Sequence, residues 1–370
     1  MRRYFFTGKS LLIIALLFGY TNLNAQSADG KSSKSTSKES VEASEHIARN
    51  MLLYQRNAGG WPKHVNDVKV DYTKKLTEAQ QASVRDDAGR NDATIDNGAT
   101  VKEIRFLTEY YKKTGTKEYL AAAEKGLRYL LEAQYDNGGW PQFFPDTSGY
   151  RKHITYNDNA MINVLNLLED VKLGQNPMDV IDRSIVSKCA AAVSKGVDCI
   201  LKTQVRVNGK LTAWCAQHDK NTFLPAKARS YELISLSGME SAKIIEFLLR
   251  QKNPSEEIKA SVVAGVNWLN DVKLNGMKFA SIPDSTKARG YDRALVADPK
   301  ESVWARFYEV ETNEPFISGR DGVKKKDLKD IDYERRVGYA WYGNWPKDLL
   351  QEKYPAWAAS NLKKPVSTKQ

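Results

Sequence analysis

Two aspartates stand in similar contexts and could together bind a metal ion. Asp96 precedes Asn97, Asp158 lies between Asn157 and Asn159, and a run with helical apolar spacing follows each site. Aspartate is a favoured N-cap residue, so helix capping alone would explain either one. If the fold brings the two carboxylates together they repel, and a hard cation with oxygen ligands relieves the repulsion. The pair predicts a calcium site, with the asparagine amides as further donors, although the EF-hand loop is absent.

A second polar set surrounds Glu232, which we interpret as the third acidic counterpart of Asp158. Arg229 lies three residues earlier and is expected at the same rim, either as a functional group or in a simple surface salt bridge with Glu232. His218 lies nearby, where a lone histidine is more often structural than catalytic. The sequence contains no GxSxG, HExxH, Walker or dinucleotide-binding glycine pattern, which argues against those enzyme classes.

Arginines alternate with aromatic residues in two segments of the C-terminal region. Arg320 lies between glycines in Ser318–Gly322, and Tyr333–Tyr342 contains two more arginines. A planar guanidinium in a loop suits bidentate carboxylate recognition, and neighbouring aromatic rings suit sugar faces. Alternatively, Tyr339, Trp341 and Trp345 fill the core of an irregular region.

A repeated element positions these side chains. The segment Leu52–Lys63, with its Gln, Gly-Gly and Trp-Pro, returns as Leu130–Gln142, and a weaker copy runs from Ile200 to Trp214. Each copy resembles the end of an apolar helix, a glutamine, a turn and a tryptophan. Such a repeat indicates stacked helix pairs whose equivalent ends lie close together.

Apolar residues recur at helical spacing from about residue 41 to 271, interrupted at Gly115 and at Gly174–Pro177. Helix pairs can close into a ring or form an open solenoid, and with three pairs a ring buries both ends. The predicted fold class is therefore mainly α: an α/α toroid of three helix-pair repeats over residues 41–275. Residues 276–370 are expected to form an irregular, partly β part that completes a cleft.

The N-terminal region is expected to direct export. Residues 1–25 combine a basic start, an apolar run and a small-residue end at Ala25, which is typical of a signal peptide. Residues 26–40 are rich in Ser and Lys and predict a flexible leader. The apolar run is too short for a membrane span. A periplasmic or extracellular location is therefore expected, and no feature argues against a monomer.

The formal net charge of +11 is compatible with an acidic partner such as a polyanionic polysaccharide, nucleic acid or lipid headgroups, or with lysines that only confer solubility. Three cysteines are too few for a disulfide scaffold. Cys189, Cys199 and Cys215 are expected to be small core residues, with a bridge from Cys215 as the alternative.

Taken together, these motifs resemble the family 10 pectate lyases. The resemblance rests on the Gly-Gly-Trp-Pro turns, Thr94–Thr100, Tyr156–Met161, Ala228–Glu232 and Ser318–Gly322, and it spans roughly residues 45–350. It implies an α/α toroid and calcium-assisted β-elimination of polygalacturonate, an acidic polysaccharide, with no nucleic acid partner. By the same resemblance, Asp96 and Asp158 bind calcium, Arg229 is the base and Arg320 binds a uronate carboxylate. Substrate contacts by Lys152, Asn157 and His218 are also implied.

An arginine base is chemically demanding because arginine has an ordinary pKa above 12. Nearby calcium and Arg320 would favour its neutral form, and Lys227 is a second candidate because lysine loses its proton more readily. Two other functions are compatible with the residues alone: an inverting glycoside hydrolase that uses two carboxylates as acid and base, and a non-catalytic protein that binds acidic glycans.

Overall fold

The computed structural model describes the backbone of residues 32–362 and the side chains of residues 42–362, so the predicted signal peptide lies outside the described residues. The chain divides into two units, Met1–Ala43 and Ser44–Gln370. Helix α1 (Ser32–Tyr54) begins within the predicted leader and continues into the second unit. The description below concerns the second unit.

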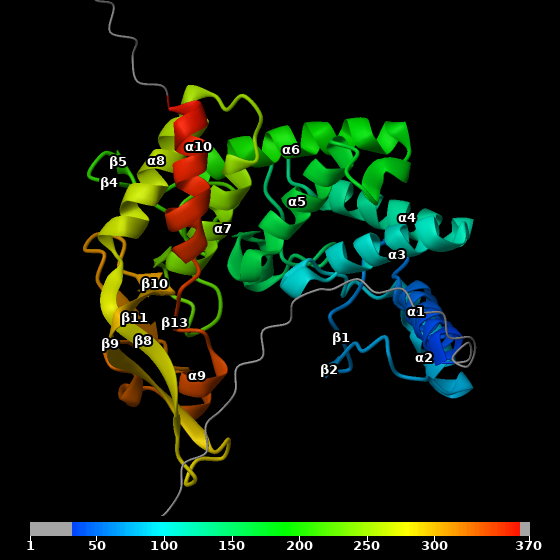
Figure 1. The fold of residues 1–370 in the computed structure, drawn as a ribbon, viewed down its shortest axis with the longest axis horizontal. Coiled ribbons are helices and arrows are strands. Elements are labelled where there is room, and N and C mark those ends of the chain that lie inside the picture. Colours follow the sequence, from blue (N-terminus) through cyan, green and yellow to red (C-terminus); the bar gives the residue numbers. More distant parts are fainter. Residues whose placement is uncertain (1–31, 363–370) are drawn as a thin grey trace, which may run out of the picture. The chain divides into compact units, whose positions relative to one another are not determined.

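Three antiparallel helix pairs form the centre of this unit (Figure 1). They are α3 (Val101–Thr114) with α4 (Lys117–Ala133), α5 (Ala160–Lys172) with α6 (Arg183–Thr203), and α7 (Gly238–Leu249) with α8 (Glu256–Asp271). Outside the pairs lie α2 (Glu78–Asp86), α9 (Tyr333–Gly338), a π-helical turn (Leu349–Lys353) and α10 (Tyr354–Asn361). The predicted breaks are confirmed, since α3 ends at a left-handed Gly115 with a φ of 73°.

Most strands are short and pair in small antiparallel sheets. The strands are β1 (His64–Val65), β2 (Val68–Lys69), β3 (Ile154–Thr155), β4 (Arg206–Val207), β5 (Lys210–Leu211), β6 (Gln217–His218), β7 (Leu236–Ser237), β8 (Leu274–Pro283), β9 (Tyr291–Ala305), β10 (Phe307–Tyr308), β11 (Pro315–Ser318), β12 (Lys324–Lys325) and β13 (Tyr342–Gly343). The largest sheet has the order β12-β11-β10-β7 and joins the third helix pair to the C-terminal part. β8 and β9 form a long hairpin, so the C-terminal part is more regular than the sequence predicts.

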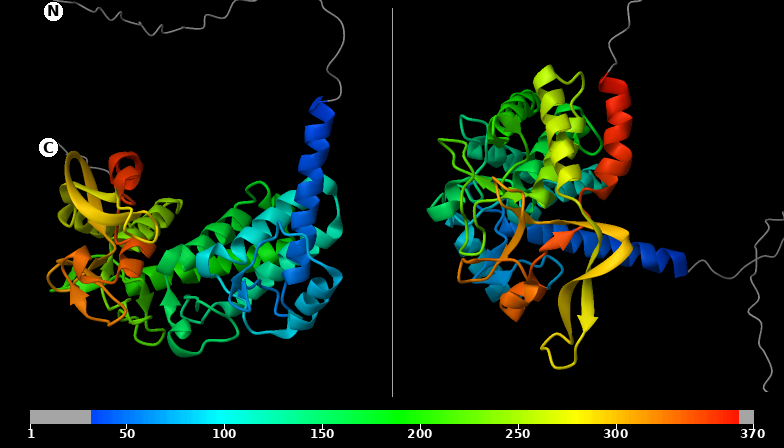
Figure 2. Two further views of the ribbon diagram at one scale, coloured as in Figure 1. Left: turned by 90° about the horizontal axis from the view of Figure 1, so that it is seen from below. Right: turned by 90° about the vertical axis from the view of Figure 1, so that its left-hand side faces the viewer.

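The predicted toroid is wrong. The first pair packs on the second and the second on the third, and the first and third pairs lie at opposite ends of an open row (Figures 1 and 2). Within residues 32–362, about 48% of the structure is helical and 17% is strand, with no closed barrel. Ring closure was expected because it would bury both ends of the row. Here other elements do so: Gln55, after α1, bonds to α4, while β9 and the π-helical turn contact α7.

Side-chain hydrogen bonds of three glutamines connect successive copies of the repeat. Each follows the last residue of a helix and donates from Nε2 to a carbonyl in its own turn and to a carbonyl in the next copy's helix. The pairs of acceptors are Gly59 and Ala122 for Gln55, Gly138 and Ala192 for Gln134, and Thr212 and Ser261 for Gln204. All six distances are between 2.7 and 3.0 Å. The repeated glutamine is therefore architectural.

A tryptophan closes each of these turns by donating its indole N–H to a carbonyl near the end of the preceding helix. The bonds run from Trp61 to Met51, from Trp140 to Leu130, from Trp214 to Ile200 and from Trp304 to Leu269. The Trp304 bond reveals a fourth copy, which the sequence hides because β8 and most of β9 separate α8 from this tryptophan near the end of β9.

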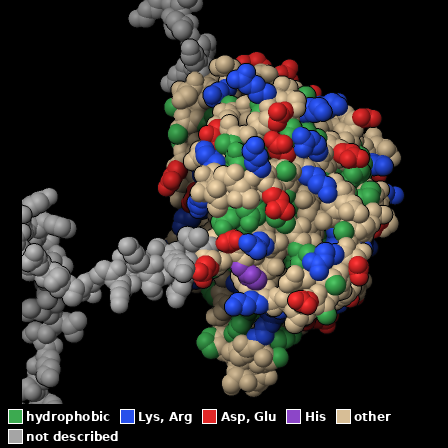
Figure 3. Space-filling model, turned by 90° about the vertical axis from the view of Figure 1, so that its right-hand side faces the viewer, with side chains coloured by type: hydrophobic (Ala, Val, Ile, Leu, Met, Phe, Trp, Pro, Cys, Tyr) green, Lys and Arg blue, Asp and Glu red, His purple; other side chains and the backbone are tan. Residues whose placement is uncertain are grey.

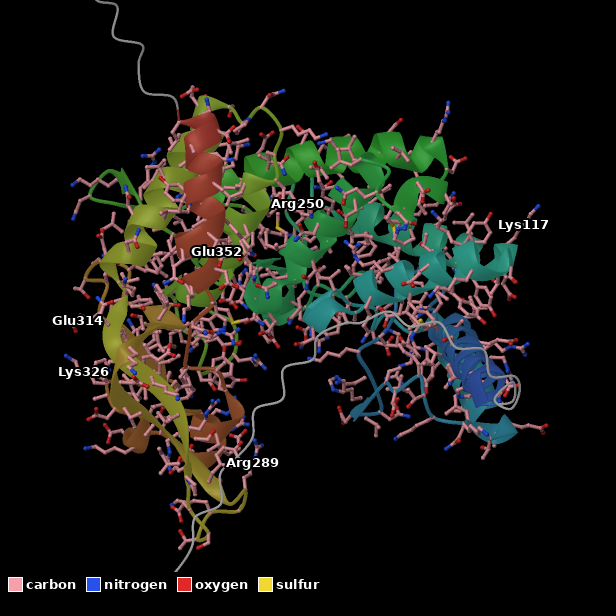
Figure 4. All side chains as sticks on the ribbon, viewed as in Figure 1. Lys117, Arg250, Arg289, Glu314, Lys326 and Glu352 are labelled. Atoms are coloured by element: carbon pink, nitrogen blue, oxygen red, sulfur yellow. The ribbon has the colours of Figure 1, made fainter. Side chains whose placement is uncertain are left out.

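Asp170 of α5 ties the three pairs together. It accepts hydrogen bonds of 2.5 Å from Arg105 of α3 and from Arg250 at the end of α7. Arg250, labelled in Figure 4, lies where α5 and α7 meet and also donates to Asn166. All three cysteines are buried free thiols, which confirms the prediction that they are core residues.

Charged side chains of both signs are intermingled on the face drawn in Figure 3. On that face the positive net charge is therefore not gathered into one basic patch. Among the described helices, none is long and apolar enough to cross a membrane.

Candidate active site

Two short 3₁₀ turns carry the two aspartates and pack against each other. They are Asp96–Gly98, just before α3, and Asn157–Asn159, just before α5. The backbone N–H groups of Thr94 and Thr155 donate to the carbonyls of Trp61 and Trp140 respectively, which fixes the correspondence between the copies. Asp96 therefore corresponds to Asn157, and Asp158 to Asn97. The two aspartates are close in the fold but offset by one residue in the repeat.

The offset shows in the backbone. Asn97 and Asp158 share a left-handed conformation, with φ/ψ of 50°/35° and 51°/29°. Asparagine and aspartate tolerate this region better than most residues. The sequence match between the copies thus reflects a shared turn geometry, and the carboxylates project from adjacent positions of that turn.

In the third copy, the residue that corresponds to Asp158 is Glu240, so the interpretation of Glu232 as the counterpart was wrong. The Ser237 N–H donates to the Trp214 carbonyl, which aligns Ser237 with Thr155. Glu240 is 1% exposed and its Oε1 accepts from the Asp158 N–H at 3.2 Å. In the sequence, Ser237 and Glu240 form only a helix-capping pattern. The Ser237 hydroxyl accepts a hydrogen bond from the Glu240 N–H at the start of α7.

Asp96 is held by Lys63. The Lys63 Nζ donates to Asp96 Oδ2 at 2.7 Å, and the Asp96 side chain is largely buried. The other carboxylate oxygen, Oδ1, is buried and has no hydrogen-bond partner among the described residues. A buried carboxylate oxygen without a partner is costly, and it marks a position where a further donor or a cation would bind favourably.

Asp158 is held by Arg306, a residue that the sequence reasoning missed. Arg306 Nη2 donates to Asp158 Oδ1 at 2.9 Å, to Glu240 Oε1 at 2.8 Å and to Asn157 Oδ1 at 3.1 Å. Burial lowers the pKa of Arg306, but the charges of Glu240, Tyr339 and Asp158 outweigh it and the net pKa is raised. Arg306 is therefore a permanent buried cation between two acids.

The predicted salt bridge between Arg229 and Glu232 is present. Arg229 donates from Nε to Glu232 Oε2 at 2.7 Å and from Nη2 to Oε1 at 2.5 Å, while Glu232 is 2% exposed. Burial lowers the pKa of Arg229. The hydrogen bond and the charge of Glu232 raise the pKa by more than burial lowers it, so the net pKa lies above its ordinary value. The ion pair therefore opposes the expected shift of Arg229 towards its neutral form.

Tyr339 connects the arginine and aspartate groups. Its ring lies 4.5 Å from the Arg306 guanidinium, and its hydroxyl donates to Glu232 Oε1 at 3.3 Å. A continuous network thus runs from Asp158 through Arg306, Tyr339 and Glu232 to Arg229. From the sequence, Tyr339 could also be a residue that only fills the core. It does pack against the hydrophobic core, but it also contacts Arg306 and Glu232.

Three arginines surround the ring of Tyr231. The guanidinium of Arg335 lies 4.6 Å from the ring centroid, that of Arg229 5.0 Å and that of Arg320 6.0 Å. Glu334 accepts from Arg320 at 3.2 Å and from Arg335 at 2.8 Å. The Arg335 hydrogen bond is the main cause that lowers the pKa of Glu334 to about 2. We call Arg229, Arg320 and Arg335 around Tyr231 the arginine cluster.

The remaining predicted site residues lie in different environments. Asn157 is 2% exposed and donates to Asp158 Oδ2 at 2.9 Å, so it orients that carboxylate. Lys152 is exposed at the end of the 3₁₀ turn Gly149–Lys152, and Lys227 is exposed two residues before Arg229.

His218 cannot contact a ligand in this structure. It is fully buried, its Nε2 accepts from the Cys215 N–H at 3.0 Å, and its Nδ1 lies 2.8 Å from the Phe223 carbonyl oxygen. Burial lowers its pKa to about 4. The expectation of a substrate contact by His218 is therefore corrected to a structural role, which the sequence reasoning named as the commoner one.

The oxygen donors fit a hard cation better than a transition metal. In the part of the chain that the structure describes, no group of three or more His, Cys, Asp or Glu side chains is arranged to hold a metal ion. The buried Oδ1 atoms of Asp96 and Asn159 nevertheless have no partner within residues 42–362. Carboxylate and amide oxygens without partners are of the type that calcium prefers as ligands.

Comparisons with known proteins show the family of this chain. A family model described as pectic acid lyase matches residues 55–350. Two solved structures of a family 10 polysaccharide lyase from Cellvibrio cellulosa are similar at 36% sequence identity and a TM-score of 0.73. One is a mutant in complex with trigalacturonic acid, and the alignment covers 89% of this chain and 95% of that one. The other covers 89% and 94%. No curated protein matches.

Proposed function

The chain belongs to the pectic acid lyase family and is a polysaccharide lyase that cleaves pectate, and from that premise we propose a role for each residue of its site in the reaction. Asp96 and Asp158 bind calcium, Arg229 removes the proton, and the arginine cluster binds uronate carboxylates. The observation that carries this assignment is the network through Tyr339, which joins Asp158 to Arg229.

The arginine cluster supplies the charge that an acidic sugar chain requires. The related structure holds trigalacturonic acid, and polygalacturonate has one carboxylate on each sugar unit. Arg320 pairs through its Nε and Nη2 atoms with Glu334, but 60% of its side chain stays exposed, so its Nη1–Nη2 edge can pair with two carboxylate oxygens of a ligand. Tyr231 is 5% exposed and packs between the arginines, so it positions their guanidinium groups. These contacts support an acidic polysaccharide as the partner.

β-Elimination requires a base at C5 and compensation of the charge that develops on the carboxylate. When the C5 proton is removed, the electrons of the C–H bond form the C4–C5 double bond, the C4–O bond breaks, and the leaving oxygen takes a proton. When bound, calcium would stabilise the negative charge that builds up on the substrate carboxylate. Asp96 and Asp158 would hold it, because the two turns that carry them pack against each other and the Asp96 Oδ1 atom has no partner within the described residues.

Arg229 must lose a proton before it can accept one. Its pairing with Glu232 favours the charged form, so the neutral form is minor and should increase with pH. We therefore propose that proton removal becomes faster at alkaline pH and that Glu232 fixes the orientation of the guanidinium. Lys227 remains the second candidate on the same loop.

The two alternatives have less support. An inverting hydrolase needs one carboxyl group that carries a proton, but Asp96 and Asp158 both accept from cations, Lys63 and Arg306. A non-catalytic binding protein would not require Glu232 to be buried beneath the guanidinium of Arg229. Family membership points in the same direction.

Product analysis tests the assignment. The protein is incubated with polygalacturonate, with calcium and with a chelator, while ultraviolet absorbance and reducing ends are followed. The lyase produces absorbing unsaturated oligogalacturonides, and the chelator abolishes their formation. Reducing ends without absorbance would indicate a hydrolase, and absorbance that persists in chelator would contradict the calcium role.

We also propose that the protein is exported, to the periplasm or to the medium. The composition of residues 1–25 supports this proposal, as does a substrate that is a large external polymer. Cell fractionation followed by N-terminal sequencing tests it. A mature chain that begins after Ala25 is expected, and an intact Met1 in the cytoplasmic fraction would contradict it.

A further inference from the structure

A cavity of about 550 Å³ adjoins the Asp96 side of the site. Its walls come from the β1–β2 hairpin, the segment before Asp96 and the loop after Trp140, and Lys63 lines it. Because Lys63 Nζ is bonded to Asp96 Oδ2, the cavity and the proposed calcium site share a side chain. Pockets of about 300–1,000 Å³ commonly hold small ligands, so the space suits sugar units that continue from the reacting one.

Two arginines in the cavity wall have the chemistry to bind a carboxylate. The Arg151 guanidinium lies 4.4 Å from the Phe143 ring centroid, and its Nη1 donates to Asp146 at 2.5 Å. These two contacts hold the guanidinium in place while its other N–H groups have no partner within the described residues. An arginine stacked on an aromatic ring presents its edge for bidentate recognition of a carboxylate.

Arg90 is the second arginine and is only loosely neutralised. Its contacts to Asp87 and Asp92 are 3.3 Å long, and its contact to Asn66 is 3.2 Å. Asp92 already has a stronger partner, because the fully buried Arg56 donates to both of its oxygens at 2.6 and 2.9 Å. Arg56 therefore compensates the Asp92 charge, and the 3.3 Å contact to Asp87 is the acidic contact that a ligand carboxylate would have to replace on Arg90.

The other acidic groups of the wall are Asp146 and Asp67. Asp146 is paired with Arg151. Asp67 lies in the turn of the β1–β2 hairpin and is the lining carboxylate for which residues 42–362 show no cation. The lining thus holds three basic side chains (Lys63, Arg90 and Arg151) and three acidic ones (Asp67, Asp92 and Asp146), so recognition of an anion rests on the free N–H groups of the two arginines and not on a net positive charge.

The two copies of the repeat build this wall together. The Gln142 N–H donates to the Arg151 carbonyl at 2.9 Å, and Thr94 pairs with Phe143 in a β-bridge two residues before Asp96. The loop that carries Arg151 is thereby fixed beside the strand that leads to Asp96. The cavity is a built extension of the site and not an incidental gap between mobile side chains.

We propose that this cavity is a distal subsite that binds a further uronate unit of the same polymer through Arg151 and Arg90. The proposal rests on the proposed function, since it places the additional unit on the Asp96 side of the cleavage site. It gives the enzyme a preference for longer substrates, and that preference can be measured separately from the chemistry.

The test compares hexagalacturonate with trigalacturonate in the wild type, Arg151→Ala and Arg90→Ala. The ratio of kcat/KM on the hexamer to that on the trimer should fall about 5- to 10-fold in each variant, because one charge-assisted contact is lost only for the longer chain. The matched control is Arg128→Ala, which removes an exposed arginine of α4 that pairs with Glu124 outside the cavity and should keep the wild-type ratio.

A binding experiment separates this proposal from the proposed function. Calorimetry with hexagalacturonate is carried out on Arg229→Ala protein, with and without Arg151→Ala or Arg90→Ala. Weaker binding of the hexamer, with unchanged binding of the trimer, supports the subsite even if no lyase activity is found. An unchanged hexamer-to-trimer ratio together with unchanged hexamer affinity in both variants would overturn it.

Discussion

Lys63 and Arg306 occupy equivalent positions in the first and fourth copies of the repeat, and each donates to a carboxylate of the site. Lys63 lies two residues after Trp61, and Arg306 two residues after Trp304. Lys63 bonds to Asp96 at 2.7 Å, and Arg306 bonds to Asp158 at 2.9 Å. The position two residues after the repeated tryptophan thus places a cation beside each of the two aspartates.

Lys63 competes with a metal for Asp96, so its removal should strengthen calcium binding. Lys63→Met eliminates a partly exposed ion pair, whose loss is worth about 1 kcal/mol, or roughly 5-fold in affinity. Calorimetric titration with calcium should show a smaller Kd for Lys63→Met than for the wild type. Lys102→Met, which removes a lysine paired with Glu103, is the control and should leave Kd unchanged. Weaker calcium binding by Lys63→Met would mean that Lys63 positions Asp96 for the metal.

Arg306 is needed for stability as well as for the site. Arg306→Met leaves the buried Glu240 carboxylate without its cation, and breaking a buried ion pair in this way costs about 3–5 kcal/mol. Urea unfolding should show a loss of that size. In contrast, Arg105→Met removes a partly exposed contact to Asp170 and should cost clearly less. Equal losses in the two variants would contradict the assignment of Arg306 as the cation of a buried network.

Glu232 should set the pH dependence of the reaction. In Glu232→Gln the charge that raises the pKa of Arg229 is gone, so the neutral guanidine forms at lower pH. The alkaline rise of kcat should therefore move to lower pH, even if the maximal rate falls because the orientation is less well fixed. The measurement is kcat against pH for both proteins on polygalacturonate. A profile with the same midpoint would show that Arg229 is not the group that titrates.

His218 should make the fold sensitive to acid. Its pKa is about 4 in the folded protein, below the ordinary value of about 6.5, so folding favours the neutral ring. This contribution is fully present above pH 6.5 and is lost as the pH falls towards 4, by roughly 3 kcal/mol in total. Urea unfolding between pH 7 and pH 4 should show this decline. Burial also lowers the pKa of the nearby His153, which acts in the same direction.

His218→Gln separates this effect from general acid denaturation, because it removes the titrating ring. Its free energy of unfolding should depend less on pH between 6.5 and 4 than that of the wild type. The exposed His64 provides the control, and His64→Gln should retain the wild-type slope. If both variants show the wild-type slope, the acid sensitivity comes from other groups.

The stacking of helix pairs could be predicted from the repeat in the sequence. Whether the row of pairs closes into a ring could not. The Gln and Trp residues correctly indicated stacked helix pairs, since Trp61 and Trp140 close the same turn in the structure. Whether the row closes depends on the small rotation between neighbouring pairs and on what covers its ends. Neither is encoded in a local pattern, and the fourth copy is hidden because β8 and most of β9 separate Trp304 from α8.

The candidate site was only partly predictable for a related reason. Asp96, Asp158 and Arg229 could be singled out as candidates because they follow recognisable turns. Glu240 and Arg306 were missed because Glu240 reads as an ordinary helix-start residue and Arg306 as part of a strand-like segment. Their roles depend on contacts across the fold, such as the 2.8 Å bond between them. A cation two residues after a repeated tryptophan was the signal that could have pointed to Arg306.

The most direct test of the account is the rate of unsaturated product formation from polygalacturonate by Arg229→Ala, compared with Lys227→Ala on the same loop. Loss of a positioned base lowers the rate by about 100- to 10,000-fold. The account predicts a fall of that size in Arg229→Ala, with calcium affinity unchanged, and a rate within about 2-fold of the wild type in Lys227→Ala. A folded Arg229→Ala protein that keeps its activity while Lys227→Ala loses it would contradict the account and assign the base to Lys227.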